Sequence, residues 1–584
     1  MKATSGRVPP MTPNSMPQAS DTWTYPSPSN AAHQHGQTYC TQTAKRLETT
    51  APFSLLLVPQ HPQLEKMLSL DIPSALLTAL LVFIGTRIVN YFKFAKQTGY
   101  LPGLRSLATP ISVLGASLPT GRFNPGLNWQ WQWRKHVYEA YARHGTETIS
   151  SLPYLFGEPA IYTSSLEVAR QIVSTRGSFY KHTETTGITL EWGPNLFAAN
   201  GDEWKRFRRV ITPAFSSSTY ASLLTEAASI FDQMVAGEGW LTKDSVDIPN
   251  SDFLTNKFAL IVIATSGFGH PLSWNLKSAS LSDEMSFGEA LHIRLHNLIL
   301  RLILPQWAYW LPIKKFRDLE KATQVTQDFM NDMIRTRREE LSAGAVPKTD
   351  ILSLMIQSSE NEGRFSMTDS ELVGNTAIML FAGHETTALT LNAALGLMAL
   401  HPDFQDEMHH EVMTVMPTEA DFTFANSSKL RKTQACFLEA SRIYPSGFMW
   451  IRDAAEDIVL EHVGPNRDQR IPVPKGTRLV VDSIGLHHNP RLFPDPEAFK
   501  PERWYDVSEN ALTMFSMGAR ACIGRRFAIT EATCFLAKLV RDWRVEILTR
   551  GGESKAQWEA KYMEGRAVTN FGIAEMPVRL VRRA

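Results

Sequence analysis

The sequence has little that could hold a fold together covalently or through structural metal ions. Its 584 residues include only four cysteines, which are too few and too widely separated for a disulfide framework: Cys40, Cys436, Cys522 and Cys534. No second cysteine or histidine stands near Cys522 with the C-x-x-C or H-x-x-x-H spacing of a zinc site. This cysteine usage favours a catalytic domain in a reducing compartment.

An excess of charge of one sign is also missing. The net charge is +1, so the charge balance does not favour nucleic acid as a partner. No G-x-G-x-x-G follows a predicted strand, which excludes a nicotinamide or flavin site of that type. An apolar fraction of 43% and a charged fraction of 20% are typical of a globular protein, and the length suits a large enzyme fold.

The N-terminal part differs from the rest in composition. Residues 1–63 are poor in apolar periodicity and begin with a stretch rich in Pro, Ser, Thr, Gln and Asn, which predicts a disordered extension. We predict a membrane anchor over residues 64–92, because the chain from 72 to 92 is apolar for about 20 residues, the length that spans a bilayer. An interfacial or docked helix is the alternative. Residues 93–584 form the predicted catalytic domain, and Lys93, Lys96 and Arg105 would keep it cytosolic.

Residues 515–524 read Phe-Ser-Met-Gly-Ala-Arg-Ala-Cys-Ile-Gly, and a helical pattern follows at once. A helix N-terminus favours a thiolate at Cys522, and Gly518 and Gly524 let the backbone approach a flat ligand closely. A buried structural cysteine is the alternative.

The order Phe515, Gly518, Arg520, Cys522, Gly524 resembles the haem-binding loop of the cytochrome P-450 family of haem-thiolate monooxygenases. The resemblance implies haem b as the cofactor, with Cys522 as the axial iron ligand and the other four residues around the haem.

A long helix is predicted over residues 368–400. Thr368 and Glu371 have the spacing of a capping box, and about 33 residues would extend for about 50 Å. The helix is apolar nearly all round, which indicates burial. Polar residues interrupt it at 384–387 and at Asn392, which disfavours a transmembrane helix.

The string from Ala382 to Thr387 resembles the oxygen-activating motif of the same family. The resemblance implies that Gly383 leaves room for dioxygen and that the Thr386 hydroxyl bonds the iron-bound oxygen. It also implies that Glu385 helps to relay protons, whereas His384 faces away. An acid beside an alcohol suits a reaction that consumes two protons.

Other family motifs follow in order. Trp204 and Arg208 share a helix face and resemble the pair that bonds one haem propionate, while Arg452 matches an arginine at the other propionate. Glu439 and Arg442 resemble the structural Glu-x-x-Arg pair, with Arg503 as its third member; this group serves folding and haem retention.

The fold implied is mainly α with a minor β lobe, and the haem lies between the long helix and the Cys522 loop. Short extended runs from 148 to 173 predict a small β element before a helix. The turn at 474–477 predicts a β-hairpin. Residues 218–345 correspond to the family's lid over the substrate pocket.

The resemblance implies insertion of one oxygen atom from O2 into an apolar small molecule, and a terpenoid or another secondary metabolite is our leading hypothesis. NADPH electrons would arrive through a separate, membrane-bound flavoprotein reductase that docks near Arg525 and Arg526. We predict an endoplasmic reticulum location with a single-pass anchor. By position, the substrate pocket contains Phe381, Ala382, Phe448, Met449 and Phe571.

Two alternatives stay open. The first is a haem-thiolate isomerase or dehydratase that uses neither dioxygen nor a reductase; the intact pair Glu385 and Thr386 argues against it. The second is a haem-binding or membrane-interacting protein without enzymatic activity, which five motifs in family order disfavour.

Overall fold

The structure is a computed structural model that describes residues 72–121, 124–126, 139–173, 177–275, 285–297, 300–301, 304–344, 350–360, 365–463, 468–567 and 569–583. All of them from residue 75 onward belong to one compact unit. The predicted extension, residues 1–63, and the first part of the predicted anchor, residues 64–71, lie outside the described residues.

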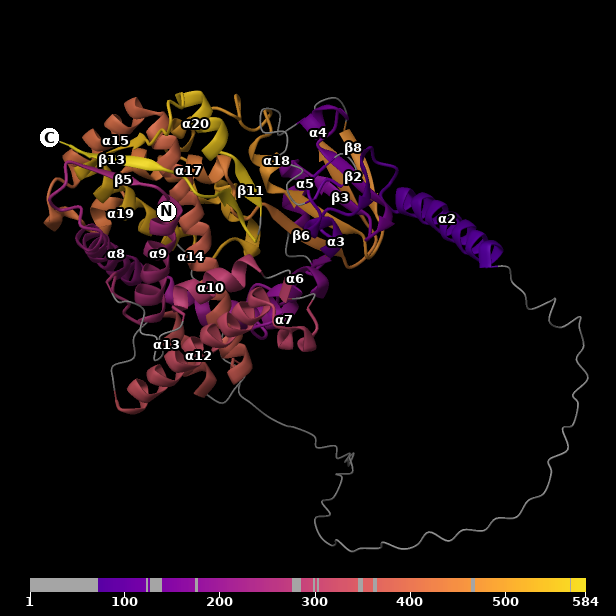
Figure 1. Ribbon diagram of the computed structural model, residues 1–584, viewed down its shortest axis with the longest axis horizontal. Helices are drawn as coiled ribbons and strands as arrows, with labels where there is room; N and C mark the ends of the chain where they lie inside the picture. Colours follow the sequence, from indigo (N-terminus) through magenta and orange to yellow (C-terminus); the bar gives the residue numbers. More distant parts are fainter. Residues whose placement is uncertain are drawn as a thin grey trace, which may run out of the picture. The chain divides into compact units, whose positions relative to one another are not determined.

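The long predicted helix is present as α14 (Asp369–Leu400). Its capping box is confirmed, because the Glu371 N–H donates to Thr368 Oγ1 and the Thr368 N–H donates to Glu371 Oε2. The helix is buried over most of its length, as its apolar circumference predicts. It packs against α9 (Ser251–Val262), α17 (Arg431–Ile443) and α12 (Lys314–Ser342) (Figure 1).

The other helices surround this core (Figure 1). They are α3 (Val113–Ser117), α4 (Glu139–Ala142), α5 (Leu166–Ile172), α6 (Thr183–Leu190), α7 (Gly201–Ile211), α8 (Ser217–Gly237), α10 (Phe287–His296), α13 (Ile351–Glu360), α15 (Pro402–Val415), α16 (Phe424–Ser427), α18 (Ser483–His487), α19 (Arg525–Asp542) and α20 (Lys555–Tyr562).

The largest sheet has six strands, and Figure 1 shows it grouped with α3, α4 and α5 to one side of the main helices. Its order is β1 (Gly103–Ala108), β2 (Thr148–Phe156), β3 (Ala160–Thr163), β9 (Arg478–Asp482), β6 (Met449–Ala454) and β4 (Phe179–Tyr180). The predicted β element followed by a helix is therefore confirmed as β2, β3 and α5. The predicted class, mainly α with a minor β lobe, is confirmed as well.

Smaller sheets hold the remaining strands. Strands β10 (Trp543–Ile547), β13 (Val578–Arg582) and β5 (Ser245–Ile248) form one sheet in that order. Strand β11 (Gly565–Ala567) pairs with β12 (Phe571–Ile573), and β7 (Ile458–Val463) pairs with β8 (Asp468–Val473).

The predicted hairpin at residues 474–477 is wrong. A turn is present, with the Thr477 N–H bonded to Pro474 O and Gly476 at φ +79°. The strands on either side of it do not pair with each other: β8 pairs with β7, and β9 pairs with β3 and β6. The turn therefore carries the chain from one sheet to another, and pairing partners of this kind are not encoded in the turn itself.

Helix α2 (Ile72–Gln97) covers the described part of the predicted anchor. From Pro73 to Gln97 it is long and apolar enough to cross a membrane by length and composition. Its apolar side chains are largely exposed. Arg87 donates Nη1 to Leu155 O at 2.7 Å, and the Tyr91 ring stacks on Tyr154. These contacts join the C-terminal half of α2 to strand β2.

Gly374 allows a close approach between α14 and a loop. A Cβ at this position would stand 2.5 Å from Pro194 O and 2.7 Å from Gly193 C, and neither backbone atom can easily move. We therefore expect Gly374→Ala to destabilise the protein by about 1–3 kcal/mol, although alanine is the better helix former. The measurement is the midpoint of urea unfolding.

Gly187 provides the matched control, because it lies in α6 and a Cβ added there would have no neighbouring atom within 4 Å. Gly187→Ala should be neutral or stabilising by up to about 1 kcal/mol. Equal stability of the two variants would contradict the close approach at Gly374.

Candidate active site

The loop that carries Cys522 is closed by its own backbone. The Cys522 N–H donates to Phe515 O at 2.9 Å, so the two ends of the loop meet. Between them, Ser516 has φ +62° and Gly518 has φ +66°. Glycine tolerates this conformation, whereas a serine there is strained. The loop thus has a strained backbone conformation directly before α19.

The Cys522 side chain keeps accessible surface, although protein atoms surround it closely. Burial raises the pKa of its thiol, and this effect outweighs the Gly524 N–H and the charges of Arg208 and Arg525, which lower it. The Gly524 N–H at the helix N-terminus favours the thiolate, as expected, but burial outweighs its effect on the pKa. A bound metal cation would reverse the balance, because a coordinating thiol loses its proton.

The other described cysteines do not share this exposure. Cys436 and Cys534 are buried, and burial raises the pKa of both thiols. Cys40 lies outside the described residues. Cys522 is thus the exposed thiol in the part of the chain that the structure describes.

Four cationic side chains gather beside the Cys522 loop. Burial lowers the pKa of Arg452 on β6 to about 10. Burial and the charges of Arg452 and Arg208 lower the pKa of Arg520 to about 10. The pKa of Lys181 falls well below its usual value for the same reasons, burial first and then Arg452 and Arg520. The pKa of Arg208, on α7, is lowered by burial.

Only neutral groups hold these cations in place. Arg452 donates to Ile451 O at 2.8 Å, Arg520 to Ala199 O at 2.8 Å and Arg208 to Ala521 O at 3.2 Å. Lys181 donates to Phe197 O, and Arg520 lies 4.2 Å from the centroid of the Trp204 ring.

Among the ion pairs between described residues, none joins Lys181, Arg208, Arg452 or Arg520 to a carboxylate. Cations withdrawn from water without a counter-charge are unfavourable. The cluster therefore suits a ligand with more than one negative charge.

The middle of α14 also keeps accessible surface where a core helix normally has none. Ala382 is exposed although Leu380 and His384 beside it are buried. Thr386, one turn later, is partly exposed, and its Oγ1 donates to Ala382 O at 2.9 Å. This helix segment therefore has a free face in the middle of the fold.

The acid next to Thr386 has a raised pKa. Burial raises the pKa of Glu385 to about 7, although Asn570 Nδ2 donates to its Oε2 at 2.9 Å. His384 is buried on another side of the helix, where burial lowers its pKa to about 4. A Cβ on Gly383 would stand 2.8 Å from Ile263 Cγ1, so this glycine makes room for Ile263. Its predicted role beside dioxygen stays a prediction.

These features fit haem. A haem carries two propionates that the four cations could neutralise, and an iron ion that an accessible cysteine could ligate. The uncovered face of α14 at Ala382 leaves accessible surface next to which a porphyrin could lie. Two observations support this fit. The four cations have no ion-pair partner among the described residues. Helix α14, although mostly buried, is accessible at Ala382.

The Glu439 carboxylate forms a fully buried polar centre. Arg442 donates Nε and Nη2 to it at 2.9 and 2.8 Å, and Arg503 Nε lies 3.4 Å away. The Lys500 N–H and Trp504 Nε1 add bonds of 3.0 and 2.8 Å. Arg442 also bonds His487 O and Ala498 O. The structure thus brings together the three residues that the sequence motif predicted.

The predicted pocket residues divide into two groups. Phe381 is partly buried and packs on Trp192, and Met449 is partly buried at the start of β6. Phe448 and Phe571 are buried and their rings contact each other, with centroids 6.3 Å apart. Their place in a substrate pocket stays a prediction, because neither presents accessible surface.

Three residues with evident roles were not predicted from the sequence motifs. They are Lys181 in the cation cluster, Trp504, which donates to Glu439, and Asn570, which donates to Glu385. Trp504 adjoins Arg503 and could have been found by that spacing. Lys181 and Asn570 carry no local signal, because only folding brings Lys181 near Arg452 and Arg520, and Asn570 near Glu385, which is 185 residues away in the sequence.

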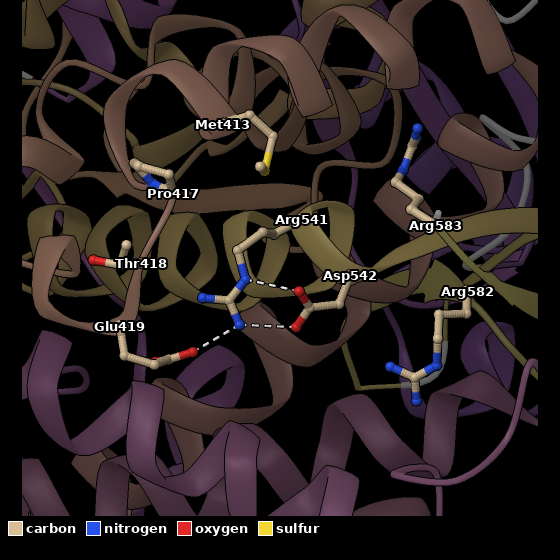
Figure 2. Close-up of a pocket in the computed structure, with 8 residues that line it drawn as sticks. All are labelled: Met413, Pro417, Thr418, Glu419, Arg541, Asp542, Arg582 and Arg583. Carbon is tan, nitrogen blue, oxygen red and sulfur yellow. Dashed lines mark hydrogen bonds and ion pairs between the residues drawn. The ribbon is translucent and has the colours of Figure 1, made fainter.

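A surface hollow of about 400 Å³ lies elsewhere, at the C-terminal end of α19 (Figure 2). It is lined mostly by polar side chains, with Met413 and Pro417 beside them, and Arg541 is bonded to Asp542 and Glu419 (Figure 2). The length of α19 places it about 25 Å from Cys522. It contains none of the predicted site residues.

Comparison with known proteins decides the family. Residues 135–561 match the family model described as cytochrome P450. This chain belongs to the cytochrome P450 family. It is a haem-dependent monooxygenase, an oxidoreductase that incorporates oxygen from O2, as this family is.

Its relatives are of the same kind. The chain is 31% identical over 457 residues to cytochrome P450 monooxygenase 124 of Postia placenta, covering 76% of this chain and 87% of the relative. It is 29% identical over 389 residues to the cyclooctat-9-en-7-ol 5-monooxygenase of Streptomyces melanosporofaciens, covering 65% and 78%. The fold matches a crystal structure of the cytochrome P450DA haem domain with TM-score 0.64 and 20% identity, covering 83% of this chain and 99% of that chain.

The buried ion pair predicts a large effect. Glu439→Ala would leave Arg442 buried without its counter-charge and would remove the acceptor from Lys500 N and Trp504 Nε1. We expect a loss of about 3–5 kcal/mol in the free energy of unfolding, measured by urea denaturation. The control is Asp332→Ala, whose ion pair with Arg335 is exposed and should contribute less than about 1 kcal/mol. Similar losses in both variants would argue against a structural centre at Glu439.

Proposed function

We propose that Cys522 is the axial ligand of haem b and that the protein hydroxylates an apolar small molecule. The observation that carries this proposal is the cluster of four cations without a counter-charge around an accessible cysteine. When bound, haem supplies an electron-rich iron at which dioxygen is reduced. The overall reaction takes substrate, O2, two electrons and two protons and yields the hydroxylated product and water.

The cations hold the cofactor in this proposal. Arg208 and Arg520 neutralise one propionate, with Trp204 beneath Arg520, and Arg452 neutralises the other. Phe515, Gly518 and Gly524 shape the loop around the cysteine. Glu439, Arg442 and Arg503 stabilise the structure that supports the Cys522 loop, and they do not contact the reactants.

Thr386 and Glu385 donate and transfer protons in this proposal. The raised pKa of Glu385, about 7, allows it to hold a proton and to release it near neutral pH, as a proton donor should. The Thr386 hydroxyl lies on the free face of α14 and passes the proton toward the oxygen being reduced. Buried side chains around this segment keep bulk water from supplying protons without control.

We propose a terpenoid or another apolar secondary metabolite as the substrate. The support is the aromatic and aliphatic surroundings of Phe381 and the similarity to an enzyme named for an unsaturated alcohol, cyclooctat-9-en-7-ol. Phe381, Ala382, Met449, Phe448 and Phe571 would line the pocket, the last two after a local rearrangement.

Electrons come from NADPH through a separate flavoprotein reductase in this proposal. Arg525 is mostly buried and bonded to Glu509 O, whereas half of the Arg526 side chain is exposed. Arg526 is therefore the better candidate for docking an acidic partner.

We also propose the domain division given above, with residues 64–92 as a single-pass anchor in the endoplasmic reticulum membrane. The exposed apolar surface of α2 supports an anchor. Trp307 and Trp310, 60% and 86% exposed and followed by Lys314 and Lys315, are residues that favour a membrane interface.

Replacing the cysteine tests the iron ligand. We expect Cys522→Ala to abolish the thiolate-type absorption of the reduced carbon monoxide complex, because no other described thiol is accessible. The control is Cys534→Ala, which should keep that spectrum. A thiolate-type spectrum from Cys522→Ala would identify another ligand.

The activity itself is tested with the full chain in membranes, with reductase, NADPH, ¹⁸O-labelled O2 and a panel of terpenoids, followed by mass spectrometry. We expect one labelled oxygen per product. Thr386→Ala should divert electrons into hydrogen peroxide, lowering product per NADPH by about tenfold or more, while Thr387→Ala should not. A rearranged product formed without reductase would support an isomerase instead.

A further inference from the structure

A C-terminal segment, residues 569–574, lies along the face of α14 that carries Glu385. Asn570 Nδ2 donates to Glu385 Oε2 at 2.9 Å. Seven residues after Glu385, and therefore on the same helix face, Asn392 Nδ2 donates to the carbonyl oxygens of residues 573 and 574 at 3.2 and 3.0 Å. The segment thus contacts this face at two places, two turns of the helix apart.

Gly572 allows a close approach between these two contacts. A Cβ on Gly572 would stand 2.9 Å from Leu389 Cβ and 2.8 Å from Leu389 Cδ2. Leu389 follows Glu385 by four residues and lies on the same face of α14. A larger residue at 572 would push the segment away from the helix. The glycine therefore permits the contact between the Asn570 amide and the Glu385 carboxyl.

The segment is also fixed on the sides that do not face α14. The Phe571 N–H donates to Ser446 O at 3.0 Å. Thr569 Oγ1 donates to Leu295 O, near the end of α10, at 3.0 Å. Asn570 lies between these two anchored residues, so its amide reaches Glu385 from a fixed position.

We propose that Asn570 is a positioning residue for Glu385, whose amide occupies Oε2 and so keeps the transferable proton on Oε1. This inference rests on the proposed function of Glu385 and Thr386. In a neutral carboxyl group one oxygen carries the proton and the other only accepts hydrogen bonds. The oxygen that accepts the Asn570 N–H is therefore the one without the proton. Asn570 itself exchanges no proton and acts through Glu385.

The same amide serves the acid after the proton has left. Loss of the proton from Oε1 leaves a carboxylate, and the N–H bond to Oε2 becomes a stronger, charge-assisted bond. Uptake of one proton from water restores the neutral acid. No electron is gained or lost in either step. Asn570 thus favours release of the proton and fixes the oxygen from which it leaves.

The titratable groups around Glu385 are unchanged by a substitution at the amide. Burial is the main cause of the raised pKa of Glu385, and the charge of Asp252 on α9 adds to it. His384 on α14 is neutral near pH 7, because burial lowers its pKa to about 4. Further away, His292 on α10 acts on His384, and Glu575, which follows the C-terminal segment, acts on Asp252. A changed titration of Glu385 in a variant of the amide therefore reports the lost bond.

Asn570 could instead only anchor the segment to α14. That role affects stability and leaves the protonation of Glu385 unchanged. Thr569 provides the matched control, because its hydroxyl anchors the neighbouring residue to Leu295 O. Thr569→Val keeps the shape of the side chain and removes an anchor of the same segment without removing a bond to Glu385.

The first measurement needs no turnover. Infrared difference spectra of the substrate-free holoenzyme, recorded as a function of pH, should show the protonated carboxyl band of Glu385, which Glu385→Gln assigns by its loss. In Asn570→Ala we expect the band at higher frequency, because its C=O no longer accepts a hydrogen bond. The titration midpoint should rise from the wild-type pKa, about 7, by about one pH unit, because the carboxylate has lost its donor. Thr569→Val should keep both values.

The second measurement is coupling in membranes with reductase and NADPH. For Asn570→Ala we expect product per NADPH at pH 7 to fall by about tenfold, with hydrogen peroxide rising, because the acid releases its proton less readily and from either oxygen. Thr569→Val should couple as the wild type does.

A second variant covers the case in which Asn570→Ala does not fold. Asn570→Asp keeps the shape of the side chain and replaces the amide by a carboxyl group. Two adjacent carboxyl groups cannot both ionise easily, so the pair should hold a proton to higher pH than Glu385 does in the wild type. A wild-type midpoint in Asn570→Asp would contradict the proposed contact.

The outcomes separate this role from the proposed function. If Asn570→Ala keeps the wild-type band and midpoint, or if Thr569→Val changes them equally, the positioning role is overturned. Labelled product from the wild type and uncoupling in Thr386→Ala would then leave the proposed function standing. If the wild type forms no labelled product, or if Thr386→Ala couples normally, the proposed function fails, and the infrared band still decides whether Asn570 holds Glu385.

Discussion

Positive charge without a counter-charge is the constraint on which the site depends. Arg452 and Arg520 lie close enough to lower the pKa of Lys181, and Arg452 and Arg208 lie close enough to lower that of Arg520. The bonds of these cations go to backbone carbonyls. Such an arrangement is unfavourable until an anion occupies it. A bound anionic ligand would therefore stabilise the fold in this region, because it brings the missing negative charge.

The cluster also explains why the β lobe and the helices must fit together closely. Arg452 comes from β6, Lys181 follows β4, which pairs with β6, and Arg208 comes from α7. The Asn200 side chain bonds both the backbone N–H and the carbonyl of Lys181, and Asn200 directly precedes α7. Any change in the packing of these elements changes the density of positive charge in the cluster.

Burial acts in the same direction on two acids of the candidate site. It raises the pKa of the Cys522 thiol and raises the pKa of Glu385 to about 7. The physical cause is the same in both residues, because removal of an anion from water favours the protonated form.

The sequence by itself determined the features that depend on neighbouring residues. The Cys522 loop, the capped start of helix α14 and the pair Glu439 and Arg442 each depend on residues within a short stretch of sequence. The sequence alone therefore predicts them. Only the tertiary structure decided the rest. Lys181 and Asn570 acquire partners more than a hundred residues away, and the pairing of β8 with β7 replaced the expected hairpin. The sign of the Cys522 pKa shift also came from packing, because burial depends on atoms that no local pattern specifies.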